Sequence, residues 1–232
     1  MILAFDVDGT LYEGDAADPV AIEAVEAIDA AVAAGHVVVI VSGRPWIDLH
    51  RIIPDVLRST SVAVCEHGAV LVAVRAGTVE HLVTPVDPAL QDMIAATDGH
   101  DMVVYEATIG LPASARQVAE DVCARVGGCY VVGNKGSIAI VPIGCDKGTG
   151  LRRAIDHLAA SDAGMAQRPI VAIGDATNDL PMFAIADVAV AVANAEPALA
   201  ESGIELTSKG FGAGVAEALA RHVLMTSARP PV

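Results

Sequence analysis

Short apolar runs recur along this chain, and segments with helical spacing separate them. ILAFDV (2–7) and VVVIV (37–41) lie near one end, and IVAIG (170–174) and VAVAV (188–192) lie near the other. Continuous apolar runs, rather than alternating ones, are typical of strands that are covered on both faces of a parallel sheet. Together with the intervening helices, they predict an α/β fold with a doubly wound parallel sheet.

Caps and spacing predict where the connecting helices begin and end. Asp18 and Pro19 are expected to open the first helix as its N-cap and first residue, and Gly35 to end it. A second helix is expected after residues 42–45, with Ile47, Leu49 and Ile52 on it. The remaining helices expected in this α/β part lie at 148–160, 178–186, near 195–202 and at 213–224.

The middle of the chain departs from this rhythm. VLVAV (70–74) and VEHLV (79–83) flank Gly77 as in a hairpin, and Ser114 with Gln117 has the spacing of a capping box. The remaining elements expected here are a helix at 88–97, a strand at 102–106 and the strands YVVG and SIAIV on either side of 134–136. We interpret 79–144 as a small inserted α+β cap domain, and 1–78 with 145–232 as the core domain.

Composition excludes several classes of function. A net charge of −15 repels nucleic-acid backbones, and 3% aromatic residues leave no stacking platform for bases. No apolar run approaches the ~20 residues of a membrane helix, and no signal-peptide pattern precedes the first strand. We therefore expect a cytoplasmic protein without nucleic-acid or membrane partners. The acidity fits either a salt-rich cytoplasm or a genome poor in lysine codons.

Four cysteines are present, and none of them forms a C-x-x-C pair. We expect reduced, mostly buried thiols. A disulfide between Cys123 and Cys129 is the alternative.

Two polar segments follow the first predicted strands. Asp6 and Asp8 lie in DVDGT, where one carboxylate can attack phosphorus and the other can transfer protons. Ser42, Gly43 and Arg44 follow VVVIV, where a hydroxyl and free amides at a helix start are suited to a phosphoryl oxygen. For Ser42 the alternative is an ordinary helix N-cap.

Two more polar segments lie in the second half of the chain. Lys147 stands at a predicted helix start, an unfavourable place for a cation unless it offsets charge on a phosphoryl group. Asp175 and Asp179 lie in GDATND, with Asn178 between them as a positioning donor. Carboxylate oxygens of this kind are preferred by Mg²⁺. The alternatives are a solvated lysine and an Asx turn that caps the helix.

Taken in order, these four segments resemble the motifs of the haloacid dehalogenase (HAD) superfamily. The resemblance implies that Asp6 is the nucleophile, that Asp8 is the acid/base, and that Ser42 and Lys147 bind the transferring phosphoryl group. It also implies a Mg²⁺ ion held by the Asp6 carboxylate, the Asp8 backbone carbonyl, Asp175 and Asp179.

The insertion between the second and third motifs resembles the C2-type cap of the Cof-like subclass IIB. The short cap and total length are most similar to archaeal-type phosphoglycolate phosphatases. Two departures stand out: His67 in EHGA (66–69), where the family usually has E-N-G-A, and Ala176-Thr177, where Gly or Ser and then Glu are common.

Three functions follow as alternatives. The first is a Mg²⁺-dependent phosphomonoesterase that acts through an aspartyl-phosphate on a small metabolite such as 2-phosphoglycolate. The second applies this chemistry to a phosphosugar or a sugar phosphoglycerate, and the third is a non-catalytic metabolite-binding protein. Candidate cap contacts to the substrate are Tyr105, Arg116, Asn134 and Lys135. A homodimer is a further expectation.

Overall fold

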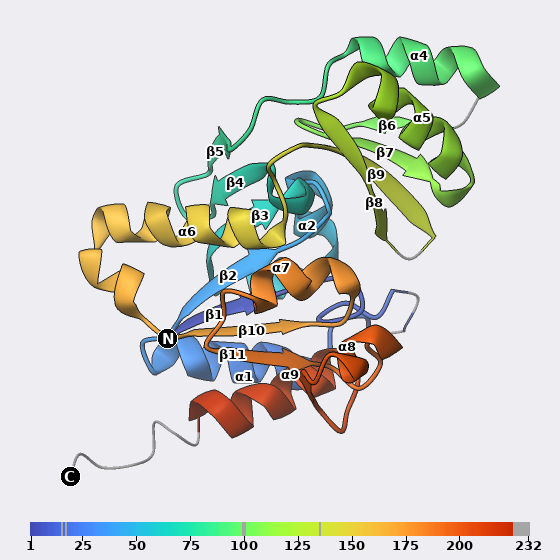
Figure 1. The fold of residues 1–232 in the computed structure, drawn as a ribbon. Coiled ribbons are helices and arrows are strands. Elements are labelled where there is room, and N and C mark those ends of the chain that lie inside the picture. The colour runs from blue at the N-terminus through green and yellow to red at the C-terminus, as the bar shows by residue number, and fades with distance from the viewer. Residues whose placement is uncertain (15, 17, 99–100, 135, 225–232) are drawn as a thin grey trace.

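The computed structural model describes residues 1–14, 16, 18–98, 101–134 and 136–224, except for the side chains of 96–98 and 134. Within these residues the chain forms two sheets (Figure 1). The larger sheet has the spatial order β12-β11-β10-β1-β2-β3-β4-β5. Its strands are β1 (Ile2–Phe5), β2 (Val37–Val41), β3 (Thr60–Cys65), β4 (Val70–Ala73), β5 (Thr78–His81), β10 (Ile170–Gly174), β11 (Val188–Ala191) and β12 (Glu205–Leu206).

Strand β1 lies near the centre of this sheet and pairs in parallel with both β2 and β10. The side chains of Leu3 and Phe5 pack into one apolar cluster, and those of Ile2 and Ala4 pack into another on the opposite face. Six strands are parallel, while β4 and β5 are antiparallel additions at one edge. The predicted doubly wound α/β fold is therefore confirmed.

Helices cover both faces of the larger sheet (Figure 1). On one face lie α1 (Ile22–Ala33), α2 (Trp46–Ile52), α3 (Pro54–Leu57) and α9 (Phe211–Leu219). On the other face lie α6 (Lys147–Ser161), α7 (Leu180–Phe183) and α8 (Pro197–Glu201). All described helices are too short or too polar to cross a membrane.

The smaller sheet is antiparallel, with the order β6-β7-β9-β8, and we call it, together with α4 and α5, the cap. Its helices cover one face of the sheet above the core (Figure 1). The elements are α4 (Ala89–Asp98), β6 (Val103–Val104), β7 (Ile109–Pro112), α5 (Arg116–Val126), β8 (Cys129–Asn134) and β9 (Ser137–Pro142). Residues 79–81, grouped with the insertion above, pair with β4 in the larger sheet. The domain boundaries stay a prediction.

Helix α1 begins later than its sequence signal. The predicted N-cap and first residue, Asp18 and Pro19, precede the helix, which starts at Ile22 without a side-chain cap. The Pro19 carbonyl accepts a hydrogen bond from the amide of Glu13 at 2.8 Å. Pro19 therefore closes the preceding loop instead of opening the helix.

The capping box predicted for α5 was also wrong. Ser114 lies in a 3₁₀ turn, and α5 starts at Arg116 without a side-chain cap. Gln117 donates to Asp121 Oδ1 at 3.0 Å, so its amide is used within the helix. The four cysteines are free and buried, as expected.

Candidate active site

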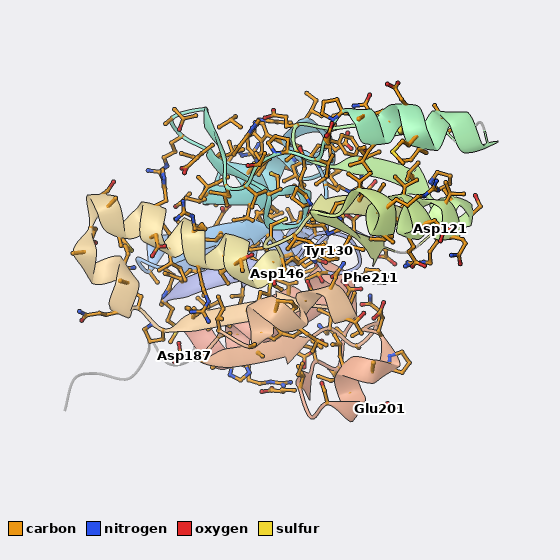
Figure 2. All side chains as sticks on the ribbon, turned by 45° about the horizontal axis from the view of Figure 1, so that its top comes forward. Asp121, Tyr130, Asp146, Asp187, Glu201 and Phe211 are labelled. Carbon is orange, nitrogen blue, oxygen red and sulfur yellow. The ribbon has the colours of Figure 1, made fainter. Side chains whose placement is uncertain are left out.

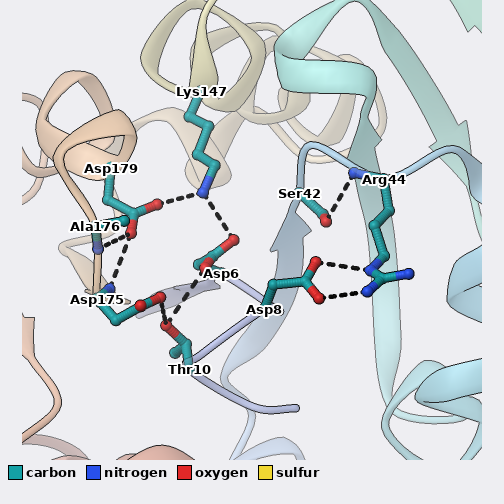
Figure 3. Close-up of polar contacts among 9 residues, drawn as sticks. All are labelled: Asp6, Asp8, Thr10, Ser42, Arg44, Lys147, Asp175, Ala176 and Asp179. Carbon is teal, nitrogen blue, oxygen red and sulfur yellow. Dashed lines mark hydrogen bonds and ion pairs between the residues drawn. The ribbon is translucent and has the colours of Figure 1, made fainter. Parts of the chain in front are cut away.

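Acidic side chains from separate segments meet at the carboxyl edge of the larger sheet (Figure 3). Asp6 follows β1, and Asp175 follows β10, the strand paired with β1. Carboxylate oxygens of Asp6, Asp175 and Asp179 lie within 4.8 Å of one another, and all three residues are buried. Since adjacent parallel strands end at one edge, the fold itself creates this cluster.

Lys147 provides the cation that faces this cluster. It is the first residue of α6, whose N-cap Asp146 forms a capping box with Thr149. Its side chain is 3% exposed, and Nζ donates to Asp6 Oδ1 at 2.7 Å and to Asp179 Oδ1 at 2.5 Å. The lysine is therefore buried and bridges two carboxylates, which excludes the solvated alternative.

Asp179 folds back onto its own loop. Its Oδ2 accepts the amide of Asp175 at 2.9 Å and that of Ala176 at 3.0 Å. Residues 177–179 accordingly form a 3₁₀ turn, and the helix predicted at 178–186 shortens to α7, Leu180–Phe183. Both carboxylate oxygens of Asp179 thus already accept hydrogen bonds, and a cation at the cluster would bind one of them in addition.

Burial dominates the electrostatics of the cluster. Burial raises the pKa of Asp6 well above its ordinary value; Lys147 opposes this rise, and the charges of Asp179 and Asp175 add to it. Burial alone would lower the pKa of Lys147, but Asp179 and Asp6 together outweigh it and raise that pKa. Three buried carboxylates exceed the charge of one ammonium, so an oxygen-preferring divalent cation fits this donor set.

Thr10 belongs to the site, although sequence reasoning gave it no role. Its hydroxyl donates to Asp175 Oδ1 at 2.9 Å and lies 3.4 Å from Asp6 Oδ2. The residue is buried and ends the DVDGT segment. The sequence signal that could have identified Thr10 is its hydroxyl, two residues after Asp8 in the same predicted turn.

The Asp8 side chain points away from the cluster (Figure 3). Asp8 forms a bidentate ion pair with Arg44: its Oδ2 accepts a hydrogen bond from Nε at 2.7 Å, and its Oδ1 accepts one from a terminal nitrogen at 2.6 Å. This hydrogen bonding raises the pKa of Arg44. The guanidinium predicted to bind substrate is thus held by the predicted acid/base. The proposed ligand role of the Asp8 carbonyl stays a prediction.

Ser42 and Gly43 shape the loop between β2 and α2. The buried Ser42 hydroxyl accepts the amide of Arg44 at 3.1 Å, and α2 begins only at Trp46. The hydroxyl therefore closes the loop rather than capping the helix. Gly43 lies against the ring of His67, where a Cβ would stand 2.5 Å from Cε1. Their contact with a substrate stays a prediction.

His67 lies at the site in the turn Glu66–Gly68, whose conformation the sequence did not predict. Its ring is buried, and it has a left-handed backbone with φ 58°. Burial first, and the charge of Lys147 second, lower the pKa of His67 to about 3. The imidazole is therefore neutral at ordinary pH and offers one donor and one acceptor nitrogen.

Among the cavities that these residues line, two lie close to His67. The interdomain cavity, about 370 Å³, lies between core and cap, and its wall includes Asp8, Arg44, His67, Tyr105 and Ser137. The inner cavity, about 180 Å³, is lined by His67, Tyr130, Val132, Asp146, Lys147, Asn178 and Pro181. Figure 2 shows Tyr130 of the cap close to Asp146 of the core at this junction.

The remaining predicted substrate contacts have different positions. Asn178 lines the inner cavity, and its buried Oδ1 has no hydrogen-bond partner within the described residues. Tyr105 lines the interdomain cavity, whereas Arg116 lines a separate cleft that also reaches Asn178. Lys135 and the Asn134 side chain lie outside the described residues.

Comparisons with known proteins identify relatives of this chain. It is 39% identical to a phosphoglycolate phosphatase from Methanothrix thermoacetophila over 74 residues, which cover 32% of this chain and 31% of that relative. The aligned part spans about a third of that relative and of two others. A Nitrosopumilus maritimus phosphoglycolate phosphatase is 25% identical over 226 residues, 93% of each protein.

A solved sugar phosphatase of HAD subclass IIB shares the fold, with a TM-score of 0.72, 17% identity, and coverage of 94% of this chain and 97% of that chain. A family model for haloacid dehalogenase-like hydrolases matches residues 3–107 and 100–219. With this match added to the four ordered segments and their convergence at one sheet edge, the chain belongs to the haloacid dehalogenase-like hydrolase family.

Proposed function

We propose that this protein is a Mg²⁺-dependent phosphomonoesterase that works through an aspartyl-phosphate on Asp6. The observation that carries the proposal is the buried Lys147 ammonium, bonded to Asp6 at 2.7 Å within a cluster of three carboxylates. A carboxylate nucleophile next to a fixed cation is suited to attack on a phosphoryl group, whose transition state carries dispersed negative charge.

The proposed reaction has two steps. A carboxylate oxygen of Asp6 forms a bond to phosphorus, the bond to the leaving oxygen breaks, and Asp8 gives that oxygen a proton. Water then attacks the aspartyl-phosphate while Asp8 takes its proton, which releases phosphate and restores Asp6. Lys147 stays hydrogen-bonded beside the reacting group throughout and offsets its charge.

We assign Mg²⁺ to the cluster of Asp6, Asp175 and Asp179 because buried oxygen donors fit it. When bound, the ion neutralises charge on the substrate and on the cluster. Asp175 keeps its position through Thr10, whose hydroxyl donates to it.

The proposed substrate is 2-phosphoglycolate, on which the named relatives act. Arg44 lines the interdomain cavity and is bonded to Asp8. An anion in the cavity can draw this guanidinium away from Asp8 and so free the Asp8 oxygens, which otherwise accept from Arg44. A substrate carboxylate in the cavity is such an anion, and it matches the planar fork of arginine.

A phosphosugar is the second candidate, because the same cavity wall also contains acceptors. The wall includes Asp48 and Asp101, and also Tyr105 and Ser137. Carboxylates repel a second anionic group but accept hydrogen bonds from sugar hydroxyls. The fold shared with a subclass IIB sugar phosphatase is compatible with this candidate.

A panel of phosphomonoesters, assayed for phosphate release with and without Mg²⁺, tests these proposals. Ethyl phosphate is the sharpest comparison, since it resembles 2-phosphoglycolate without the carboxylate. If Arg44 recognises that carboxylate, Arg44→Gln lowers the preference for 2-phosphoglycolate over ethyl phosphate about 30-fold, the value of one charge-assisted interaction of about 2 kcal/mol.

Arg58→Gln is the matched control, since Arg58 also forms an ion pair with an aspartate but is exposed and lies outside the interdomain cavity. Faster turnover of hexose phosphates than of 2-phosphoglycolate would favour the second candidate. No Mg²⁺-dependent turnover of any ester would refute the phosphomonoesterase. The expected homodimer, cytoplasmic location and lack of nucleic-acid partners stay predictions.

A further inference from the structure

The segment that carries His67 is an unusual turn with a left-handed backbone. Glu66, His67 and Gly68 have φ values of 50°, 58° and 103° in succession. Residues other than glycine rarely adopt a left-handed backbone, and they keep it only where the surrounding structure fixes it. The amides of Glu66 and His67 donate to the carbonyls of Arg44 and Ser42 at 3.0 and 3.1 Å.

The Glu66 side chain links this turn to the cap. Its carboxylate is buried, and it accepts the amides of Glu106 at 3.2 Å, Ala107 at 2.9 Å and Thr108 at 3.0 Å. The Thr108 hydroxyl adds a fourth bond at 3.0 Å. Donors from one cap loop thus converge on one core carboxylate, which is a strong arrangement because the acceptor is charged.

The loop held in this way leads to the substrate cavity. It joins β6 to β7, and within it the Tyr105 amide donates to the Thr108 carbonyl at 2.9 Å. The Tyr105 ring lies over Gly110, where a Cβ would stand 2.9 Å from Cε2, and it lines the interdomain cavity. An exposed bond between His81 and Glu106 gives the loop a second contact with the core.

We propose that Glu66 is a positioning residue: its carboxylate fixes the cap loop 105–108 on the core and so places Tyr105 in the wall of the substrate cavity. Glu66 itself does not reach the phosphoryl site. It acts on the leaving-group side through the loop, while Asp6 and Lys147 are held by the core alone. The enzymatic readout rests on the proposed function; the structural readout does not.

Amide hydrogen exchange of residues 105–109 provides the structural test, in wild type, Glu66→Gln and Thr108→Val. Glutamine keeps the size of the side chain but turns an NH₂ group toward donors, and valine removes only the hydroxyl. We expect amide exchange at 106–108 to become about tenfold faster in Glu66→Gln, because hydrogen bonds to a charged acceptor are the stronger ones. The increase should be smaller in Thr108→Val, which leaves the three amide bonds to the Glu66 carboxylate in place. Glu217→Gln is the matched control, because Glu217 also accepts backbone amides and a hydroxyl, but within the core.

Steady-state kinetics provide the second readout. In Glu66→Gln we expect the KM for the best metabolite substrate to rise about tenfold, with kcat for p-nitrophenyl phosphate unchanged within about twofold. Exchange at 106–108 equal to wild type in both variants overturns the proposal. So does faster exchange with no shift in KM beyond that of Glu217→Gln. If wild type hydrolyses no ester, the proposed function fails, and the exchange data still decide whether Glu66 anchors the loop.

Discussion

Asp6 is an acid at the end of a buried strand, and its neighbours decide its protonation. Lys147 stabilises its charge, while burial and two more carboxylates oppose it. The convergence of Asp6, Lys147, Asp175 and Asp179 could be predicted because each follows a strand or opens a helix whose position the apolar pattern reveals. The pairing of Asp8 with Arg44 could not, since it depends on how two loops turn after their strands end.

Replacing Asp6, the proposed nucleophile, separates chemistry from folding. We expect Asp6→Asn to lower turnover at least about 10⁴-fold, because an amide cannot form the acyl phosphate. The free energy of unfolding should change by no more than about 1 kcal/mol, since Lys147 keeps Asp179 and one like-charge repulsion disappears. Phosphate release and urea denaturation measure the two effects. Turnover at the wild-type rate would remove Asp6 from the nucleophile role.

His67 makes stability depend on pH. Its pKa is about 3 in the folded protein and 6.5 ordinarily, so below pH 6.5 the unfolded chain binds a proton that the folded chain does not. Stability is therefore lost as the pH falls from 6.5 toward 3. Between pH 6.5 and 5.5 we expect wild type to lose about 1 kcal/mol more than His67→Asn. Asparagine tolerates the left-handed backbone. Parallel curves of unfolding free energy against pH would contradict this account.

At the scale of elements, strands were easier to predict than helix ends. The strand at 170–174 has its predicted bounds, because a covered parallel strand must be apolar throughout. The starts of α1 and α5 were missed because Pro19 and Gln117 form bonds that compete with capping. Local signals show what a residue can do, and tertiary contacts select among those options.

Gly68 tests how tightly the Glu66–Gly68 turn is held. It has φ 103°, and a Cβ would stand 2.1 Å from the Asp146 carbonyl oxygen, so Gly68→Ala meets both strain and a backbone clash. We expect a loss of about 3 kcal/mol or more in unfolding free energy. Gly77→Ala is the matched control: its φ is 66°, with nothing within 4 Å, and it should lose only about 1 kcal/mol. Equal losses in denaturant titrations would show that the clash relaxes freely.

At the scale of the whole molecule, the proposed metal site at the carboxylate cluster would link metal binding to folding. An ion that binds only the folded state at 100 times its Kd adds about 2.7 kcal/mol of stability. For a chain of this size we expect Mg²⁺ to raise Tm by about 5–10 °C over EDTA. In Asp175→Asn this shift should shrink by more than half, whereas Glu217→Gln should keep it. Calorimetry with and without Mg²⁺ measures both, and an undiminished shift in Asp175→Asn would place the metal elsewhere.

Because β1 pairs with β10, the centre of the larger sheet stays incomplete while the ribosome synthesises the residues between them. Ile2 lies beside Ile170, so the strand that precedes Asp6 pairs with a neighbour that is synthesised much later. At usual rates of translation that delay is about 10–30 seconds. During this time the first apolar strand has β2 on one side and an open edge on the other. Chaperones that shield such edges would bind the nascent chain here, and the carboxylate cluster around Asp6 cannot form before Asp179 has been synthesised.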